Sequence, residues 1–183
     1  MPRLFTALTI PEQTRMWLST LRGGLRGARW IDPENYHITL RFIGDVNDRD
    51  TDEIHATLSR VTRAPLEIRL NGLGSFGNRK PHSIWARVEP TPELAELQGE
   101  LERRIQRLGH GPDPRRFTPH VTIARLRGVT PRDVAEWLSM RGGFSAPSFG
   151  ADEFVLLSSR SSVGGGPYVT EERYPLGLAA AAA

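Results

Sequence analysis

His37-Ile38-Thr39-Leu40 recurs later in the chain as His120-Val121-Thr122-Ile123, so the pattern His-apolar-Thr-apolar occurs twice. Successive side chains of an extended strand point to opposite faces of a sheet. The His and Thr of each tetrad are therefore predicted to share one face, while the two aliphatic side chains enter the core. From composition alone, two accidental occurrences have a probability of roughly one in a thousand. Each tetrad thus presents an imidazole and a hydroxyl side by side on a rigid element.

The repeat continues beyond the tetrads at the same spacing. Val46, Arg49, Asp50 and Glu53 correspond to Val129, Arg132, Asp133 and Glu136. Both copies have the pattern of a strand, a short turn and an amphipathic helix. We infer two related strand–helix units packed about a pseudo-twofold axis, with the two motif strands facing one another across it.

The rest of the chain alternates between strand and helix patterns. Strands are predicted at 4–10, 30–31, 37–43, 66–70, 84–88, 120–126, 154–157 and from 168 onward. Helices are predicted at 12–21, with Trp17 in its apolar spacing, at 48–62, and after the dipeptides Thr91-Pro92 and Thr130-Pro131, which favour helix starts. The total is seven or eight strands and four helices, interleaved as αβ units. Residues 1–178 are predicted to form one domain, and the alanine run 179–183 an unstructured tail.

Composition excludes several classes of protein. The chain has no Cys, which excludes disulfides, thiolate metal sites and Cys nucleophiles. No apolar run approaches the ~20 residues of a membrane span, and the N-terminus lacks the pattern of a secretory signal. A cytoplasmic protein without membrane attachment is expected. Lys80 is the only lysine beside 23 arginines; a GC-rich genome explains this bias at least as well as a nucleic-acid partner does.

Two imidazoles on opposite walls of a cleft suit an acid/base pair. With an ordinary pKa of ~6.5, one can be neutral while the other is protonated near pH 7. In-line displacement at phosphorus fits such a pair, because water attacks on one side while an oxygen leaves on the other. Thr39 and Thr122 would then donate hydrogen bonds to the non-bridging oxygens. In a regular strand Arg41 shares the face of His37 and Thr39, whereas Arg125 lies on the opposite face of its strand.

A metal site is the main chemical alternative. Two His could act as ligands, but zinc sites usually need three protein ligands, and neither tetrad contains a carboxylate. We therefore predict chemistry that requires no metal and no cofactor. The remaining His residues, His55, His82 and His110, are predicted to have surface or structural roles, and the role of the 76–82 loop stays open.

At these residues the sequence resembles the 2H phosphoesterase superfamily, and more closely the RNA 2′,3′-cyclic phosphodiesterases, also called 2′-5′ RNA ligases. The resemblance extends to about Leu176. It includes RLFTALTIP (3–11), PENYHITLRFIGDV (33–46), LNGLGSFGNRKPHSIWARV (70–88), ELERRIQRLG (100–109) and RRFTPHVTIARL (115–126).

The resemblance implies an α+β fold with two pseudo-symmetric lobes, in which antiparallel sheets from the two lobes form a central groove and helices lie outside. It implies hydrolysis of a terminal RNA 2′,3′-cyclic phosphate to a 2′-phosphomonoester, with cyclic nucleotides as smaller substrates, by a protein expected to be monomeric. His37 maps to the proton donor and His120 to the proton acceptor, although the near-symmetry of the tetrads makes these roles exchangeable on the residues alone. The residues that map to the substrate-binding pocket are Thr39, Thr122, Arg41, Arg125, Phe5, Phe117 and Tyr168.

Two further functions remain open at this level. A non-catalytic module could bind a nucleotide or RNA end in the same groove, although binding alone does not require a paired acid and base. RNA ligation, the reverse of the same displacement, would use the same residues, so sequence does not separate it from hydrolysis.

Overall fold

The computed structural model describes residues 2–159 and 165–177, and the predicted alanine tail lies outside these ranges. The described residues form four α-helices, ten strands and one 3₁₀ helix. In chain order they are β1 Arg3–Thr9, α1 Glu12–Ser19, β2 Ala28–Trp30, η1 Pro33–Asn35, β3 His37–Asp45, α2 Asp48–Leu58, β4 Leu66–Ile68, β5 Leu70–Phe76, β6 Ser83–Val88, α3 Pro92–Arg107, β7 His120–Leu126, α4 Pro131–Ser139, β8 Phe149–Ala151, β9 Glu153–Ser159 and β10 Tyr168–Pro175.

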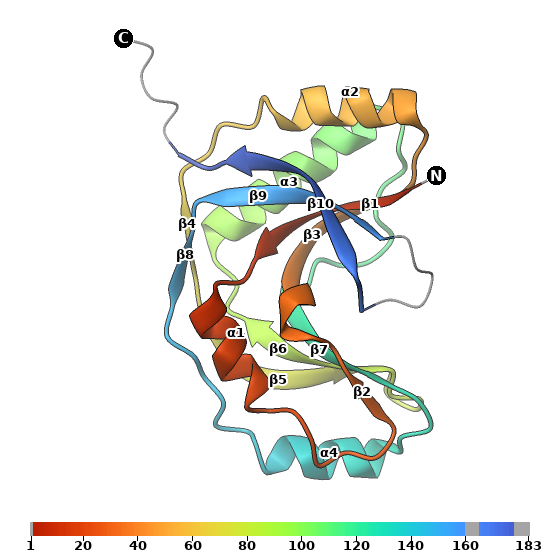
Figure 1. The fold of residues 1–183 in the computed structure, drawn as a ribbon, viewed down its shortest axis with the longest axis vertical. Helices are drawn as coiled ribbons and strands as arrows, with labels where there is room; N and C mark the ends of the chain where they lie inside the picture. Colours follow the sequence, from red (N-terminus) through yellow and green to blue (C-terminus); the bar gives the residue numbers. More distant parts are fainter. Residues whose placement is uncertain (1, 160–164, 178–183) are drawn as a thin grey trace.

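Two four-stranded antiparallel sheets divide the molecule into two lobes (Figure 1). One sheet has the order β10-β9-β1-β3 and the other β2-β7-β6-β5, while β4 and β8 form a separate two-stranded ribbon. The motif strands β3 and β7 belong to different sheets and contact one another. The predicted α+β fold with antiparallel sheets is confirmed.

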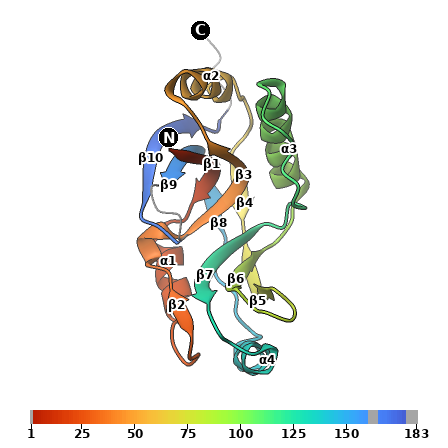
Figure 2. The same cartoon turned by 90° about the vertical axis from the view of Figure 1, so that its right-hand side faces the viewer.

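The helices lie outside the sheets (Figure 2). α3 contacts β3 and α2, and α4 contacts β5. The helices that follow the two motif strands begin in the same way: the Asn47 side chain accepts a hydrogen bond from the backbone N–H of Asp50, and Thr130 accepts one from Asp133. Each cap satisfies a helix N–H that has no partner within the helix. The repeat seen in the sequence therefore extends to how these helices start.

One continuous hydrophobic cluster connects both lobes. It contains Leu8 and Ile38 of one sheet, Ile84 and Val121 of the other, and the apolar face of α3. The apolar tetrad residues Ile38, Leu40, Val121 and Ile123 are all buried, as the strand alternation predicts. Their burial orients the His and Thr of each tetrad away from the core.

The structure differs from prediction in the count and limits of some elements. The strand predicted at 66–70 is divided between β4 and the start of β5. The glycine-containing stretch 71–77, which has no clear strand alternation, lies largely in β5, and the short strand β8 was not predicted. Trp17 fits the helical apolar spacing of α1, yet it is 45% exposed.

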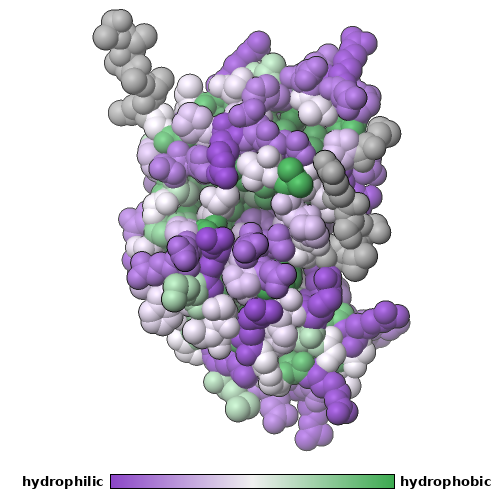
Figure 3. Space-filling view, in the orientation of Figure 1, coloured by the Kyte–Doolittle hydropathy of each residue, from purple (hydrophilic) through white to green (hydrophobic). Residues whose placement is uncertain are grey.

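The face shown in Figure 3 is dominated by hydrophilic residues, with hydrophobic ones scattered among them. Among the residues described, no helix is both long and apolar enough to cross a membrane.

Candidate active site

A cavity of about 890 Å³ brings the two tetrads together. His37 and Thr39 line it from β3, and His120 and Thr122 line it from β7. Its other walls come from β1, α3, residues 76–83, the loop that precedes β7, the 3₁₀ segment before β3 and the start of β10. The four tetrad side chains therefore share one space, which is large enough for a small-molecule ligand.

Each imidazole is fixed by a backbone carbonyl two positions earlier in the chain. Nδ1 of His37 donates a hydrogen bond to the carbonyl of Asn35 at 2.9 Å, and Nδ1 of His120 donates to the carbonyl of Thr118. Because a carbonyl can only accept, the proton of each neutral ring lies on Nδ1. The basic lone pair of each neutral ring is therefore on Nε2, the atom that can accept a proton. Asn35 and Thr118 occupy equivalent positions of the repeat, so the two imidazoles are held equivalently.

The Thr39 hydroxyl lies 3.0 Å from Nε2 of His37. With the ring proton on Nδ1, the hydroxyl donates to Nε2. Thr39, the Thr of the first tetrad, thus contacts Nε2 of His37, the nitrogen that would take part in proton transfer.

Aromatic rings enclose both imidazoles. Phe5 and Tyr168 lie 5.1 and 4.9 Å from the His37 ring, between centroids. On the other wall, Phe76 and Trp85 lie 5.0 and 5.7 Å from the His120 ring. Each imidazole therefore has two aromatic neighbours.

A β-bulge at the same place in each motif strand changes which residues face the cavity. Thr6 pairs with Arg41 and Ala7 with Thr39, so Leu40 has no partner on β1. Likewise Ile84 pairs with Ala124 and Trp85 with Thr122, so Ile123 has no partner on β6. One extra residue reverses the alternation that follows it. The cavity-facing positions after the bulges are consequently Phe42 and Arg125.

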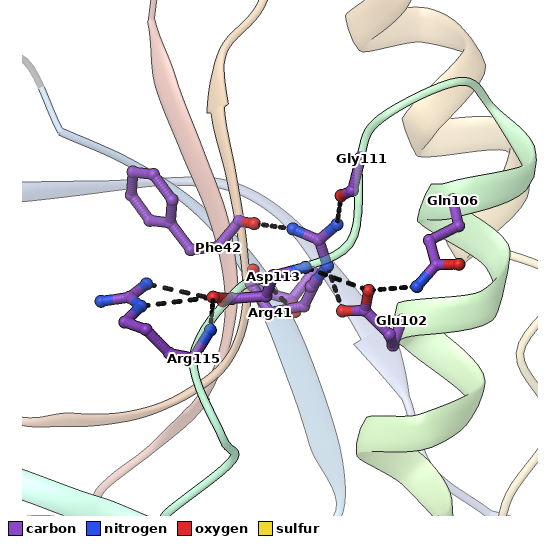
Figure 4. A network of polar contacts seen from close by, with 8 residues as sticks. Arg41, Phe42, Glu102, Gln106, Gly111, Asp113 and Arg115 are labelled. Carbon is purple, nitrogen blue, oxygen red and sulfur yellow. Dashed lines mark hydrogen bonds and ion pairs between the residues drawn. The ribbon is translucent and has the colours of Figure 1, made fainter.

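The predicted placement of Arg41 beside His37 and Thr39 is therefore wrong. Its side chain is buried, does not line the cavity, and forms an ion pair with Glu102 (Figure 4). The predicted placement of Arg125 on the face opposite His120 and Thr122 is wrong as well, because the bulge in β7 turns its side chain toward the cavity, which it lines. A regular strand was assumed, and nothing in either tetrad indicates the bulge.

Burial lowers the pKa of His37 from 6.5 to about 4, against the opposing effect of the Asn35 carbonyl. The charges of His120 and Arg125 lower it further. Burial also lowers the pKa of His120, opposed by the Thr118 carbonyl, while Arg125 and Arg115 act in the same direction as burial. Both imidazoles are thus neutral at pH 7 in the free protein. The expectation that one of them is protonated does not hold without a bound anion.

The other predicted pocket residues all reach the cavity: Phe5, Phe117 and Tyr168 line it. Phe5 belongs to a hydrophobic cluster, and Phe117 and Tyr168 pack against such clusters, so all three residues have a structural role as well. His82, predicted to have a surface or structural role, lines the cavity too.

Sequence reasoning missed several residues of the site. Phe42 was hidden by the bulge, and Phe76, Trp85 and Ser83 come from strands without a motif of their own. Phe42 could have been found through the repeat, because it occupies the position in the first copy that Arg125 occupies in the second. Within the described part of the chain, no group of three or more His, Asp or Glu residues is arranged to hold a metal ion.

Comparisons with known proteins agree with this geometry. A family model described as the 2′-5′ RNA ligase superfamily matches residues 10–162. The chain is 32% identical to an RNA 2′,3′-cyclic phosphodiesterase of Archaeoglobus fulgidus, covering 88% of this chain and 91% of the relative. It is 30% identical to a protein of the same name from Methanothermobacter thermautotrophicus, covering 95% and 98%.

Solved structures show the same fold. A crystal structure of a Thermus thermophilus protein superposes with a TM-score of 0.79 at 26% identity, covering 95% of this chain and 97% of the other. E. coli LigT in complex with 3′-AMP gives a TM-score of 0.72 at 23% identity, covering 96% and 99%. The paired tetrads, the two-sheet fold and the extent of these matches lead to one assignment. This chain belongs to the 2′-5′ RNA ligase superfamily.

Proposed function

We propose that this protein hydrolyses the 2′,3′-cyclic phosphate at the end of an RNA chain to a 2′-phosphomonoester, without a metal ion or cofactor. The relatives named RNA 2′,3′-cyclic phosphodiesterase support the substrate. The observation that carries the proposal is the pair of imidazoles in one cavity, each with its proton held on Nδ1 by a carbonyl. This arrangement supports a role for the Nε2 atom of each ring in proton transfer with a substrate bound in the cavity.

The mechanism we propose is in-line displacement at phosphorus. Water attacks the phosphorus and gives its proton to Nε2 of His120. The bond from phosphorus to O3′ breaks, and a proton on Nε2 of His37 passes to that oxygen, so the phosphate stays on O2′. The pseudo-symmetry of the site also permits the reverse assignment of the two His, and the resemblance to the family favours this one.

His37 must gain a proton before it can act as the acid, because it is neutral in the free protein. A bound phosphate carries negative charge, and an opposite charge close by favours the imidazolium. Binding of the substrate is therefore expected to be accompanied by protonation of His37. A free-protein pKa of about 4 makes this coupling strong.

Thr39, Thr122 and Arg125 line the cavity beside the imidazoles. Their hydroxyl and guanidinium groups are donors for the non-bridging oxygens, where charge increases in the transition state. Phe5 and Tyr168 border the His37 side of the same space, and Phe117 lies in the loop that leads to His120.

The proposal is tested with an RNA oligonucleotide that ends in a 2′,3′-cyclic phosphate, incubated with the protein in EDTA. We expect a 2′-phosphate as product, identified by ³¹P NMR. His37→Ala and His120→Ala should each lower the rate by about 10²–10⁴, whereas His110→Ala, outside the cavity lining, should not. Binding without product would favour an RNA-end binding module, and loss of activity in EDTA would favour a metal.

Ligation of RNA by reversal of this displacement uses the same atoms, with a ribose hydroxyl in place of water. The same assay with an acceptor RNA measures it. A cytoplasmic location and a monomeric state remain predictions, checked by fractionation and by sedimentation.

A further inference from the structure

Two buried polar atoms of the cavity wall have unused hydrogen-bonding capacity. The hydroxyl of Ser83 and Nε of Arg125 are shielded from solvent, and neither forms a hydrogen bond with any residue that the structure describes. Both residues line the cavity, and Ser83 is 1% exposed. Glu102 also lines the cavity, but its buried carboxylate oxygen is already paired with Arg41. Burying a polar atom without a partner costs free energy, so the two atoms indicate a role other than stability.

Ser83 and Arg125 lie opposite one another on neighbouring strands. Ser83 of β6 pairs with Arg125 of β7, just past the bulge at Ile123. Side chains at directly paired positions of an antiparallel sheet extend from the same face, with Cβ atoms about 4.5–5.5 Å apart. Nε of a guanidinium is a donor and a hydroxyl oxygen is an acceptor, so the two atoms are complementary. A change of rotamer in Arg125 can therefore bring Nε within hydrogen-bond reach of the Ser83 hydroxyl.

The matching place in the other lobe is apolar. There, Phe5 of β1 pairs with Phe42 of β3, just past the bulge at Leu40. Phe5 belongs to a hydrophobic cluster, and Phe42 packs against it. The two lobes thus supply equivalent imidazoles but different side chains beside them, and only the β6–β7 side supplies a complementary donor and acceptor at this place. The pair of Ser83 and Arg125 distinguishes the two sides of an otherwise symmetric site.

We propose that Ser83 is a positioning residue for Arg125. When the phosphate of the substrate binds, the terminal nitrogens of the Arg125 guanidinium contact its non-bridging oxygens, and Nε donates a hydrogen bond to the Ser83 hydroxyl. This hydrogen bond fixes the plane of the guanidinium, which has to match the oxygens that it binds. The charged oxygens of the substrate are thereby held on the β6–β7 side of the cavity. The inference rests on the proposed function, and Ser83 acts only through Arg125.

A cycle of four proteins tests this role: the unmodified protein, Ser83→Ala, Arg125→Lys and the double variant. Ser83→Ala removes the acceptor, and kcat/KM for adenosine 2′,3′-cyclic phosphate should fall about tenfold, the lower end of what a hydrogen bond to a charged group contributes. Arg125→Lys keeps the charge but has no Nε–H. Adding Ser83→Ala to it should therefore change kcat/KM by less than about twofold. Equal losses in the two backgrounds would overturn the proposal.

Thermal unfolding separates the positioning role from a structural one. Ser83→Ala removes a hydroxyl that no described residue satisfies, so the unfolding midpoint should stay the same or rise. Ser158→Ala is the matched control, because this buried serine of β9 lies outside the cavity lining and donates to the Glu171 carboxylate. The control should unfold at a lower temperature with unchanged kcat/KM. A Ser83→Ala variant that loses stability together with activity would show a structural role and overturn the proposal.

The hydrogen bond itself can be observed without catalysis, with inorganic phosphate as the probe. Phosphate should protect the Arg125 Nε–H from exchange with water in the unmodified protein, measured by ¹⁵N NMR, and protect it much less in Ser83→Ala. Equal protection in both proteins would refute the hydrogen bond. If the unmodified protein does not turn over the cyclic phosphate, the proposed function fails, which is a different result, and the phosphate measurement still tests the pair.

Discussion

Acidification should destabilise the native protein through His37. Burial lowers the pKa of this imidazole from 6.5 to about 4 in the folded state, so the unfolded chain binds the proton more readily. The stabilisation that follows is present above pH 6.5 and is lost as the pH falls toward 4. Protonating His37 inside the cavity would place a further positive charge beside that of Arg125.

The size of the effect follows from the two pKa values. The difference between the pKa of 6.5 and the folded-state pKa of about 4 corresponds to a change of about 3 kcal/mol in the free energy of unfolding, when the pH falls from above 6.5 to below 4. Between pH 7 and pH 4.5, linkage gives a loss of about 2 kcal/mol from this group alone.

Urea unfolding followed by tryptophan fluorescence at pH 7 and pH 4.5 measures the loss. Carboxylates and His120 titrate in the same range, so the informative quantity is the difference between the unmodified protein and His37→Gln. We expect the unmodified protein to lose about 2 kcal/mol more than the variant over this interval. A parallel loss in both proteins would mean that His37 titrates normally, and the argument from burial would fail.

The other predictions concern single substitutions. Arg125→Gln should raise the pKa of both His37 and His120, measured by NMR titration, and lower kcat/KM about 100-fold; unchanged titrations would contradict this. Gly74→Ala places a Cβ 2.3 Å from the Trp85 ring, which flanks His120, and should lower kcat and cost about 1–3 kcal/mol in thermal unfolding. Gly150→Ala, with no atom within 4 Å of its new Cβ, is the control, and similar behaviour of both variants would refute the steric argument. Asn47→Ala and Thr130→Ala should each lower the free energy of unfolding by about 1 kcal/mol, since each removes an equivalent helix cap. Clearly different losses in the two variants would argue against equivalent roles of the two caps.

The motif strands, the four helices and the pairing of the two imidazoles could be predicted from the sequence. These features depend on local patterns: the alternation around His37 and His120, the caps at Thr91 and Thr130, and the constant spacing of the repeat. The burial of Leu94, Leu97, Leu101 and Ile105 on α3 also follows from their spacing. Such patterns are encoded by neighbouring residues, so no tertiary information is needed to find them.

The parts that were not predicted depend on contacts between distant residues. The bulges at Leu40 and Ile123 arise from pairing with β1 and β6, and they exchange the predicted positions of Arg41 and Arg125. The partner of Arg41 is Glu102, which lies far away in the sequence on α3. The lowered pKa of His37 arises from burial and charges supplied by the fold. A tetrad alone contains none of this information.

The most direct test of the central claim is the turnover of a cyclic-phosphate-ended RNA by His37→Ala, His120→Ala and the double variant, at saturating substrate and in EDTA. If the two imidazoles act as one acid/base unit, each single variant should lose about 10²–10⁴ in kcat, and the double variant should be little slower than the slower single one. Turnover by either single variant within about tenfold of the unmodified protein would contradict the account.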